Sequence, residues 1–265
     1  MPSERDRVWT ESMPEAYAGG LEAPVFAPFA AELASRASTG TPRRVLEIAA
    51  GTGVVTRALA ESLPGIDLLA TDLNPAMVGH GARREPRARW EQADAARLPA
   101  PDGTVDLVVC GFGVMFFPDR PAAYAEVRRV LAPGGRFLFT TWDEVATHAF
   151  ADALCAGLRA AFPTDPPRFV EDVPHGYPAP ARVRADLAAA GFTDVELERV
   201  VRTGSAPSAA AVAAGFCTGT PLRAQIAERG DPGVALRTVG DTMTVRLGRG
   251  EVRGEMAAYV VEARR

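Results

Sequence analysis

The sequence has few cysteines and no pair of them at metal-binding spacing. Only three occur in 265 residues, namely Cys110, Cys155 and Cys217, and no C-x-x-C motif joins any two of them. An odd number of widely spaced cysteines is typical of reduced, buried thiols in an intracellular protein and argues against a disulfide framework. We therefore expect neither a disulfide scaffold nor a bound metal ion.

Signals for export, membranes and nucleic acids are also missing. Residues 1–7 are polar and of mixed charge, without the apolar core of a signal peptide, and no apolar run is long enough to span a bilayer. The formal net charge is -4, and no basic patch with interleaved aromatic residues argues for nucleic-acid binding. The expectation is a cytoplasmic protein without membrane or nucleic-acid partners, either a monomer or a homodimer.

What the sequence does have is an alternation of strands and helices. Apolar residues make up 47% and charged residues 23% of the chain, the balance of a globular protein. From residue 43 onward, short β-rich runs alternate with helical segments, which indicates a doubly wound, parallel α/β sheet. We expect strands at residues 44–49, 67–72, 88–92, 105–111, 136–142, 195–201 and 256–263, and helices at residues 56–62, 75–83, 120–131, 150–162 and 181–190.

The chain is predicted to form one Rossmann-like α/β domain with helical additions. Its sheet is expected to have seven strands, mostly parallel, with an antiparallel last strand. Residues 1–42, with apolar residues at helical spacing, are expected to form an N-terminal helical cover, and residues 43–265 the domain itself. The Pro-rich region 143–180 and the connection 203–253 are expected to cover the substrate, the latter because roughly fifty residues far exceed a hairpin loop.

A glycine turn follows the first predicted strand and opens a helix. Gly51 and Gly53 permit unusual backbone angles and close approach by a ligand, and the helix N-terminus presents free N–H groups. A dinucleotide fingerprint requires a third glycine, but Thr56 stands at that position. The carboxylate of Glu47, inside the strand, would repel a pyrophosphate and attract the cationic methionyl end of S-adenosylmethionine. The turn therefore favours this sulfonium cofactor over NAD.

An acidic residue ends the second predicted strand. Asp72 lies 72 − 53 = 19 residues after Gly53, a spacing that suits a carboxylate accepting hydrogen bonds from two ribose hydroxyls. The alternative is that Asp72 only caps the helix that begins near residue 75. Leu73 and Met77 follow, and we expect them to flank an adenine ring.

A second acidic residue ends the third predicted strand. Ligands of open α/β sheets gather at the carboxyl ends of the strands. There Asp94 can accept from the adenine amino group while the backbone N–H of Ala95 reads a ring nitrogen. The alternative for Asp94 is a solvated turn residue.

These residues, in this order, resemble the motifs of class I S-adenosylmethionine-dependent methyltransferases. The resemblance is carried by Glu47-x-x-x-Gly51-x-Gly53, Asp72, Asp94-Ala95 and Leu131-x-Pro133-Gly134-Gly135, and covers about residues 43–142. Within the class, the chain is similar to the ubiquinone/menaquinone-biosynthesis type. The resemblance implies that Glu47 holds the methionyl amino group, Asp72 the ribose and Asp94 the adenine, and that the product is S-adenosylhomocysteine.

The resemblance also implies where the methionyl moiety lies. Its expected lining is the glycine turn and the end of the fourth strand, made of Ala49, Gly51, Thr52, Gly53, Cys110, Gly111 and Phe112. Residues 13–17 resemble the N-terminal helix that covers the cofactor in related enzymes, with Tyr17 reaching the cofactor's carboxylate. A core role for Tyr17 is the alternative.

Methyl transfer requires that the acceptor atom be aligned with the methyl group, and a general base can assist. The candidate catalytic residues are His175 and Tyr177, in the Pro-rich connector, and His148, after the fifth strand. A solvated loop histidine is the alternative for each histidine. Apolar pockets are often lined by aromatic residues, and these occur at strand ends and in the cover segments. The expected acceptor is a small, largely apolar or aromatic metabolite, methylated on oxygen, nitrogen or carbon.

Two other functions compete with methyl transfer. The first is a protein that binds S-adenosylmethionine without transferring the methyl group, such as a cyclase or a regulatory module. The second is a nicotinamide dehydrogenase, which Thr56 and Glu47 disfavour.

Overall fold

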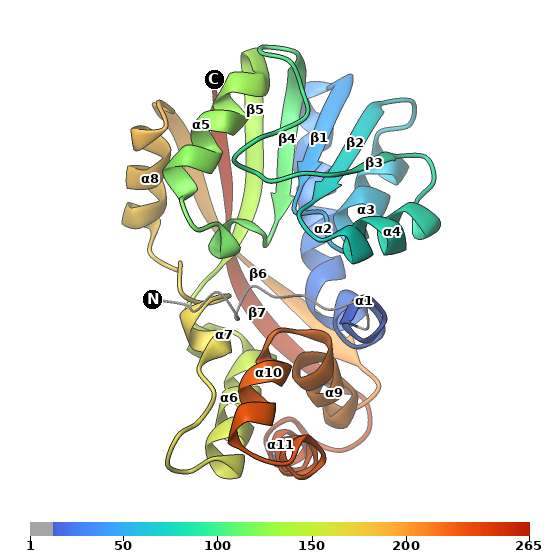
Figure 1. Ribbon diagram of the computed structural model, residues 1–265, viewed down its shortest axis with the longest axis vertical. Coiled ribbons are helices and arrows are strands. Elements are labelled where there is room, and N and C mark those ends of the chain that lie inside the picture. Colours follow the sequence, from blue (N-terminus) through green and yellow to red (C-terminus); the bar gives the residue numbers. More distant parts are fainter. Residues whose placement is uncertain (1–12) are drawn as a thin grey trace. The chain divides into compact units, whose positions relative to one another are not determined.

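The computed structural model describes residues 13–265 and contains a seven-stranded sheet (Figure 1). The strand order is β3-β2-β1-β4-β5-β7-β6. The strands are β1 (Arg44–Ile48), β2 (Asp67–Asp72), β3 (Arg89–Gln92), β4 (Val105–Gly111), β5 (Leu131–Trp142), β6 (Asp194–Ala206) and β7 (Val252–Arg264).

The sheet is mostly parallel. β1 pairs in parallel with β2 and β4, β2 with β3, and β4 with β5. β7 is antiparallel to β5: near the start of β5 the N–H of Gly134 donates to the carbonyl of Arg265 (3.2 Å), and just after its end the N–H of Asp143 donates to the carbonyl of Ala257, earlier in β7 (3.2 Å). The predicted Rossmann-like sheet with an antiparallel last strand is confirmed.

Two compact units can be distinguished by internal contacts. The sheet unit comprises Phe29–Thr141, Tyr177–Val200 and Ala258–Arg265. The helical unit comprises the described residues up to Pro28, Trp142–Gly176 and Val201–Ala257. The expected division into a cover of residues 1–42 and a domain of residues 43–265 stays a prediction.

Two helices of the sheet unit begin at residues whose side chains cap them. Its helices are α3 (Val54–Ser62), α4 (Pro75–Arg84), α5 (Arg120–Val130), α8 (Pro180–Ala189) and most of α2 (Ala27–Ala37). The Asn74 side chain accepts from the N–H of Ala76 (2.8 Å) ahead of α4, and Asp119 accepts from Ala122 (3.0 Å) ahead of α5. Both helices carry proline in the first turn, where a missing N–H costs nothing.

The core of the sheet unit is aromatic on the side of α5. Tyr124 lies 5.5 Å from Phe137 and 5.7 Å from Phe139 between ring centroids, and all three side chains are fully buried. Each such side chain contributes about 1.5–3 kcal/mol through burial. β1 and β4, central in the sheet, are buried along nearly their whole length, as parallel strands covered on both faces must be.

The helical unit contains the predicted insertion as helices. α9 (Ala209–Gly219), α10 (Leu222–Arg229) and α11 (Pro232–Leu247) fill most of residues 203–253, and α6 (Ala149–Ala161) and the short α7 (Phe169–Asp172) lie in the region 143–180. Glycines allow close crossings here. A Cβ on Gly157 of α6 would lie 2.9 Å from the Cα of Val239 in α11.

Two elements differ from the sequence prediction. After α1 (Met13–Tyr17), residues Ala18–Phe26 form a π-helix, η2, where an amphipathic α-helix was expected. Pro24 lies inside it and has no N–H to donate to an α-helical hydrogen bond. β5 begins at Leu131 and not at 136, because Leu131 pairs with Val105 before a register shift that contains Pro133-Gly134-Gly135.

The cysteines are buried as predicted. Cys110 lies in β4, Cys155 in α6 and Cys217 in α9, and each is a free, buried thiol. No helix within residues 13–265 combines the length and the hydropathy needed to cross a bilayer.

Candidate cofactor site

Two of the three non-glycine residues with positive φ within residues 13–265 lie at the carboxyl ends of β1 and β4, which are neighbours in the sheet, and the third, Thr41, precedes β1. Ala49 follows β1 with φ 52°, and Phe112 follows β4 with φ 55°. Residues other than glycine rarely adopt this left-handed conformation, and where they do they cluster at functional sites. The same edge of the sheet carries the predicted cofactor residues.

The glycine turn is fixed to the strands beside it. The N–H of Ala50 donates to the carbonyl of Thr71 in β2 (2.9 Å), and the N–H of Gly53 closes the turn on Ala50 (3.0 Å). Gly51 and Gly53 have φ values of 57° and 87°. A Cβ on Gly51 would meet no atom within 4 Å, so the backbone there is open to close approach.

Glu47 is a carboxyl group buried at this edge. Its side chain is 1% exposed, and its Oε2 has no hydrogen-bond partner among the described residues. Burial raises the pKa of Glu47 to about 8, against the lowering influence of the Thr56 hydroxyl and of Arg57. A buried acid without a partner is unfavourable unless a cation pairs with it. The site therefore fits a ligand with an ammonium group.

Asp72 joins the end of β2 to the glycine turn. Its Oδ2 accepts from the N–H of Gly51 and its Oδ1 from the N–H of Asn74, both at 2.8 Å. Burial raises the pKa of Asp72, while these two N–H groups lower it. A carboxylate offers about four acceptor positions, so each oxygen keeps one for a hydroxyl. The cap of α4 is Asn74, so the capping alternative for Asp72 is wrong.

The residues expected around the adenine differ in exposure. Leu73 is 64% exposed after β2, whereas Met77 is buried in the first turns of α4. Asp94 is exposed, and its Oδ1 accepts from the N–H of Ala96 (2.9 Å) in a turn that also holds the half-buried Ala95. Their roles at the adenine stay predictions.

The end of β4 is tightly packed. The Sγ of Cys110 accepts from the backbone N–H groups of Gly113 and Val114, and burial raises the pKa of this thiol. A Cβ on Gly111 would lie 2.7 Å from the Cγ2 of Val55. Val55, from α3, thus occupies the space that a side chain at position 111 would need.

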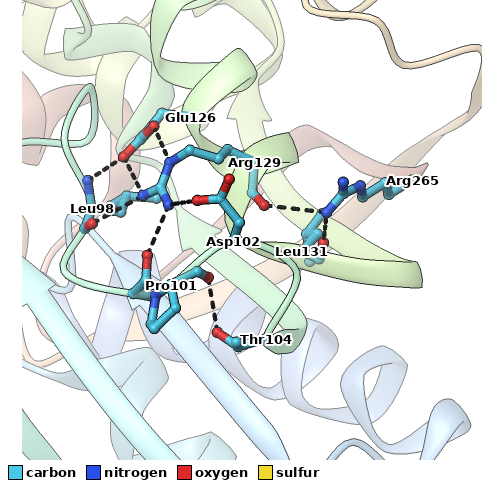
Figure 2. A network of polar contacts seen from close by, with 9 residues as sticks. Leu98, Pro101, Asp102, Thr104, Glu126, Arg129, Leu131 and Arg265 are labelled. Atoms are coloured by element: carbon cyan, nitrogen blue, oxygen red, sulfur yellow. Dashed lines mark hydrogen bonds and ion pairs between the residues drawn. The ribbon is translucent and has the colours of Figure 1, made fainter.

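The loop that carries Asp94 is anchored to α5 by one arginine (Figure 2). The guanidinium of Arg129 donates to both carboxylate oxygens of Glu126 (2.8 and 2.7 Å) and to Asp102 (2.5 Å). Glu126 in turn accepts from the N–H of Leu98 (2.8 Å). These bonds hold residues 98–102 of the loop.

Comparison with known proteins agrees with this geometry. A family model described as a methyltransferase domain matches residues 45–135. Demethylmenaquinone methyltransferase of Thermus thermophilus is 34% identical over 171 residues, which cover 57% of this chain and 75% of that protein. The chain belongs to the class I S-adenosylmethionine-dependent methyltransferases.

Other relatives of this methyltransferase have different acceptors in their names. Malonyl-[acyl-carrier protein] O-methyltransferase of Halorhodospira halophila is 34% identical over 177 residues, 58% of this chain and 60% of that protein. Among solved structures, phosphoethanolamine N-methyltransferase 2 of Haemonchus contortus has a TM-score of 0.62 at 17% identity and covers 100% of this chain and 60% of that one. That likeness is one of fold.

The two candidate histidines of the methyltransferase lie together in the helical unit. Their ring centroids are 5.5 Å apart, and Trp142 lies 4.7 Å from His148 and 5.9 Å from His175. The Nδ1 of His148 accepts from the N–H of Ala151 (3.2 Å) as the N-cap of α6. Burial lowers the pKa of His148 well below its usual range. No sequence signal predicted that the two rings would meet.

His175 has a defined tautomer. Its Nδ1 lies 2.7 Å from the carbonyl oxygen of Asp143. Because a carbonyl only accepts, Nδ1 must carry the proton and Nε2 a lone pair. Burial lowers the pKa of His175 to about 4, so the ring is neutral at pH 7.

Tyr177, in the sheet unit, is held in place by contacts at its hydroxyl and at its ring. It is 2% exposed, its hydroxyl donates to Asp186 in α8 (2.9 Å), and the guanidinium of Arg120 lies 4.2 Å above its ring. Burial raises the pKa of this phenol.

Tyr17, in the helical unit, stacks on Phe26 at 5.0 Å between ring centroids. The catalytic role of Tyr177 and the cofactor contact of Tyr17 stay predictions.

One residue that supports the site was missed from the sequence. The Trp90 ring lies against the glycine turn, 3.1 Å from where a Cβ on Gly53 would be, and also fills the space beside Gly81 in α4. Its indole N–H donates to the carbonyl of Glu85 (3.0 Å). A glycine inside a helix, such as Gly81, can mark close packing and was the available signal. Within residues 13–265, no three His, Cys, Asp or Glu side chains are grouped to hold a metal ion.

Proposed function

We propose that the methyltransferase moves the methyl group of S-adenosylmethionine to a small, largely apolar or aromatic metabolite, with the cofactor held at the carboxyl ends of β1, β2 and β4. The observation that carries this site is the buried Glu47 carboxyl, whose Oε2 lacks a partner beside an open glycine turn. A cationic amino group satisfies that carboxyl.

Each predicted residue has one role in the proposal. Glu47 binds the methionyl amino group and Asp72 the two ribose hydroxyls, while Asp94 and Ala95 recognise the adenine edge. Leu73 and Met77 contact the adenine faces. Lining for the methionyl moiety comes from Ala49, Gly51, Thr52, Gly53, Cys110, Gly111 and Phe112, with Tyr17 at the cofactor's carboxylate.

When bound, S-adenosylmethionine supplies a methyl group on a sulfonium that is open to in-line displacement. The chain must then orient the acceptor and exclude water. His175 is the proposed general base, because the hydrogen bond to Asp143 fixes its proton on Nδ1 and leaves Nε2 to accept. His148, packed on the same tryptophan, and Tyr177 are the other members of the proposed catalytic set.

The acceptor is assigned by class. Segments 143–180 and 203–253 are proposed to select it, and the buried aromatic side chains of the helical unit, such as Trp142 and Phe150, favour an apolar or aromatic molecule. The relative from Thermus thermophilus is named for demethylmenaquinone, so a demethylated quinone is the first acceptor to test.

Two measurements test this function. Titration calorimetry should detect binding of S-adenosylmethionine and S-adenosylhomocysteine but not of NAD⁺, and the reverse result would refute the cofactor assignment. Transfer of a labelled methyl group should then be measured over quinone, phenol and amine acceptors. Tight cofactor binding with no labelled product from any acceptor would favour a protein that binds the cofactor without using its methyl group.

A further inference from the structure

Two polar side chains face each other in the interior of the sheet unit without satisfying each other. Glu47 in β1 is 1% exposed and Thr56 in α3 is 0% exposed. Neither Oε2 of Glu47 nor Oγ1 of Thr56 makes a hydrogen bond of ordinary geometry among the described residues, although the hydroxyl lies close enough to lower the pKa of the carboxyl. Buried polar atoms in such a state are rare, and each calls for an explanation.

The groups around Glu47 leave it protonated in the ligand-free protein. Burial is the largest influence and raises its pKa to about 8, and the Asp72 carboxylate at the end of β2 raises it further. Thr56 and Arg57, both on α3, lower it. Cys110, on β4, is a neutral thiol because burial raises its own pKa. At neutral pH the carboxyl therefore carries a proton.

We propose that the ammonium group of the bound cofactor displaces a proton from Glu47, and that Thr56 is the positioning residue for this exchange. The proposal rests on the cofactor role of Glu47 given above. In the step, the O–H bond of the carboxyl breaks, the proton passes to the buffer, and the carboxylate that remains pairs with the ammonium. No electrons are transferred and no other bond changes.

The Thr56 hydroxyl suits both states of the carboxyl. A hydroxyl can accept from a protonated carboxyl and can donate to a carboxylate, whereas a glycine at this position could do neither. The residue that breaks the dinucleotide fingerprint thus has a function of its own, which is to keep the buried acid in place before and after it loses its proton.

The number of released protons follows from the titration. With a pKa of about 8, the carboxyl is about nine-tenths protonated at pH 7 and about one-tenth protonated at pH 9. Binding should therefore release about 0.9 proton at pH 7, where the amino group of the ligand is already an ammonium. Because the proton competes with the ligand, affinity should rise almost tenfold from pH 6 to pH 7.

The test is calorimetry of S-adenosylhomocysteine binding to the full chain in phosphate and in Tris, whose heats of ionisation differ. The dependence of the binding heat on the buffer gives the number of protons released. We expect close to one at pH 7 for the wild type and close to none for Glu47→Gln. With the wild-type protein, 5′-methylthioadenosine, which lacks the amino-acid end, should release none. This last comparison needs no variant and so does not depend on the folding of one.

Thr56 is tested by a matched pair of substitutions. Thr56→Val keeps the shape but removes the hydroxyl, so the pKa of Glu47 should rise and the proton release at pH 7.5 should be closer to one than in the wild type. Thr56→Ser should behave as the wild type. A Thr56→Val variant that loses affinity equally at every pH, with an unchanged proton count, would limit Thr56 to packing and overturn its part.

The results of these experiments distinguish a failure of the proposed cofactor role of Glu47 from a failure of the proposed proton exchange. Unchanged affinity in Glu47→Gln would overturn the cofactor role of Glu47 itself. Weakened affinity in that variant, with no proton released by the wild type at pH 7, would leave the cofactor role in place and overturn the proton exchange alone.

Discussion

At the scale of single residues, the site depends on carboxyl groups that the fold does not fully satisfy. Asp72 gives half of its acceptor capacity to the backbone of Gly51 and Asn74, and the Oε2 atom of Glu47 has no hydrogen-bond partner among the described residues. Both features are understandable if a ligand completes the hydrogen bonding. The effect of each residue on ligand affinity can therefore be measured apart from its effect on the free energy of unfolding.

Replacing Asp72 with asparagine should weaken binding of S-adenosylhomocysteine by about 1–3 kcal/mol, the penalty for stranding a polar partner. Asn retains only one acceptor oxygen for the two backbone N–H groups and two hydroxyls. The matched control is Asp67→Asn, at the opposite end of β2, where the carboxylate is exposed and pairs with Arg89 on the surface. Equal affinities of the two variants, measured by calorimetry, would rule out the ribose role.

Replacing Glu47 with glutamine should have opposite effects on stability and on binding. The unfolded carboxyl ionises near pH 4.5 and the folded one near 8, so unfolding releases a proton between these values and stability falls as pH rises. The neutral amide removes this cost. We expect Glu47→Gln without ligand to be more stable than the wild type by about 4 kcal/mol at pH 8 and nearly equal to it at pH 4.5, as measured by urea unfolding. A variant less stable at both pH values would contradict this.

At the scale of elements, the sequence predicted those strand and helix bounds that depend on residues close by in the chain. β2 and β4 have the predicted bounds, and α4 starts at the predicted residue because Asn74 and Pro75 cap it. It did not predict η2 or the early start of β5, because both depend on neighbours distant in sequence: Gly20 of η2 packs against Gly215, and Leu131 of β5 pairs with Val105. In the site, glycines and acids were predictable from spacing, whereas the Trp90 packing and the His148–His175 contact required the tertiary fold.

Two glycines of α4 provide a test of that tertiary contact. A Cβ on Gly81 would overlap the Trp90 ring, whereas a Cβ on Gly79 would meet only the end of Arg83, at 3.7 Å. Gly81→Ala should therefore destabilise the protein by about 1–3 kcal/mol through overpacking. Gly79→Ala should stabilise it by about 0.5–1 kcal/mol through helix propensity. The free energies of unfolding of both variants, measured with urea, test this contact. Similar effects of the two substitutions would show that Trp90 does not lie against α4.

At the scale of the whole molecule, each unit has its own sensitivity to pH. The buried acids with raised pKa values, Glu47 and Asp72, lie in the sheet unit, and the buried histidines with lowered pKa values, His148 and His175, lie in the helical unit. The sheet unit loses stability as pH rises toward 8. The helical unit loses stability as pH falls, because these histidines bind protons more tightly in the unfolded chain than in the folded protein.

The acid side can be measured through His175. Its pKa is 6.5 in the unfolded chain and about 4 in the folded one, so lowering the pH from 6.5 to 4.5 should cost about 2–3 kcal/mol from this residue. In His175→Asn, the amide can still donate to the Asp143 carbonyl but does not titrate, and the loss over this range should shrink by that amount. Parallel stability curves for the wild type and the variant between pH 6.5 and 4.5 would contradict the assignment.

The three buried cysteines allow local opening of the protein to be measured at three separate positions. Burial raises the pKa values of Cys155 and Cys217 to about 12 and that of Cys110 further, so none of them presents a thiolate to reagents at neutral pH. Each thiol should react with a disulfide reagent only after its own element opens, whether α6, α9 or β4. Peptide mapping of labelled cysteines in native buffer should yield three separate opening rates. If the cofactor binds in the sheet unit, S-adenosylhomocysteine should slow the labelling of Cys110 most.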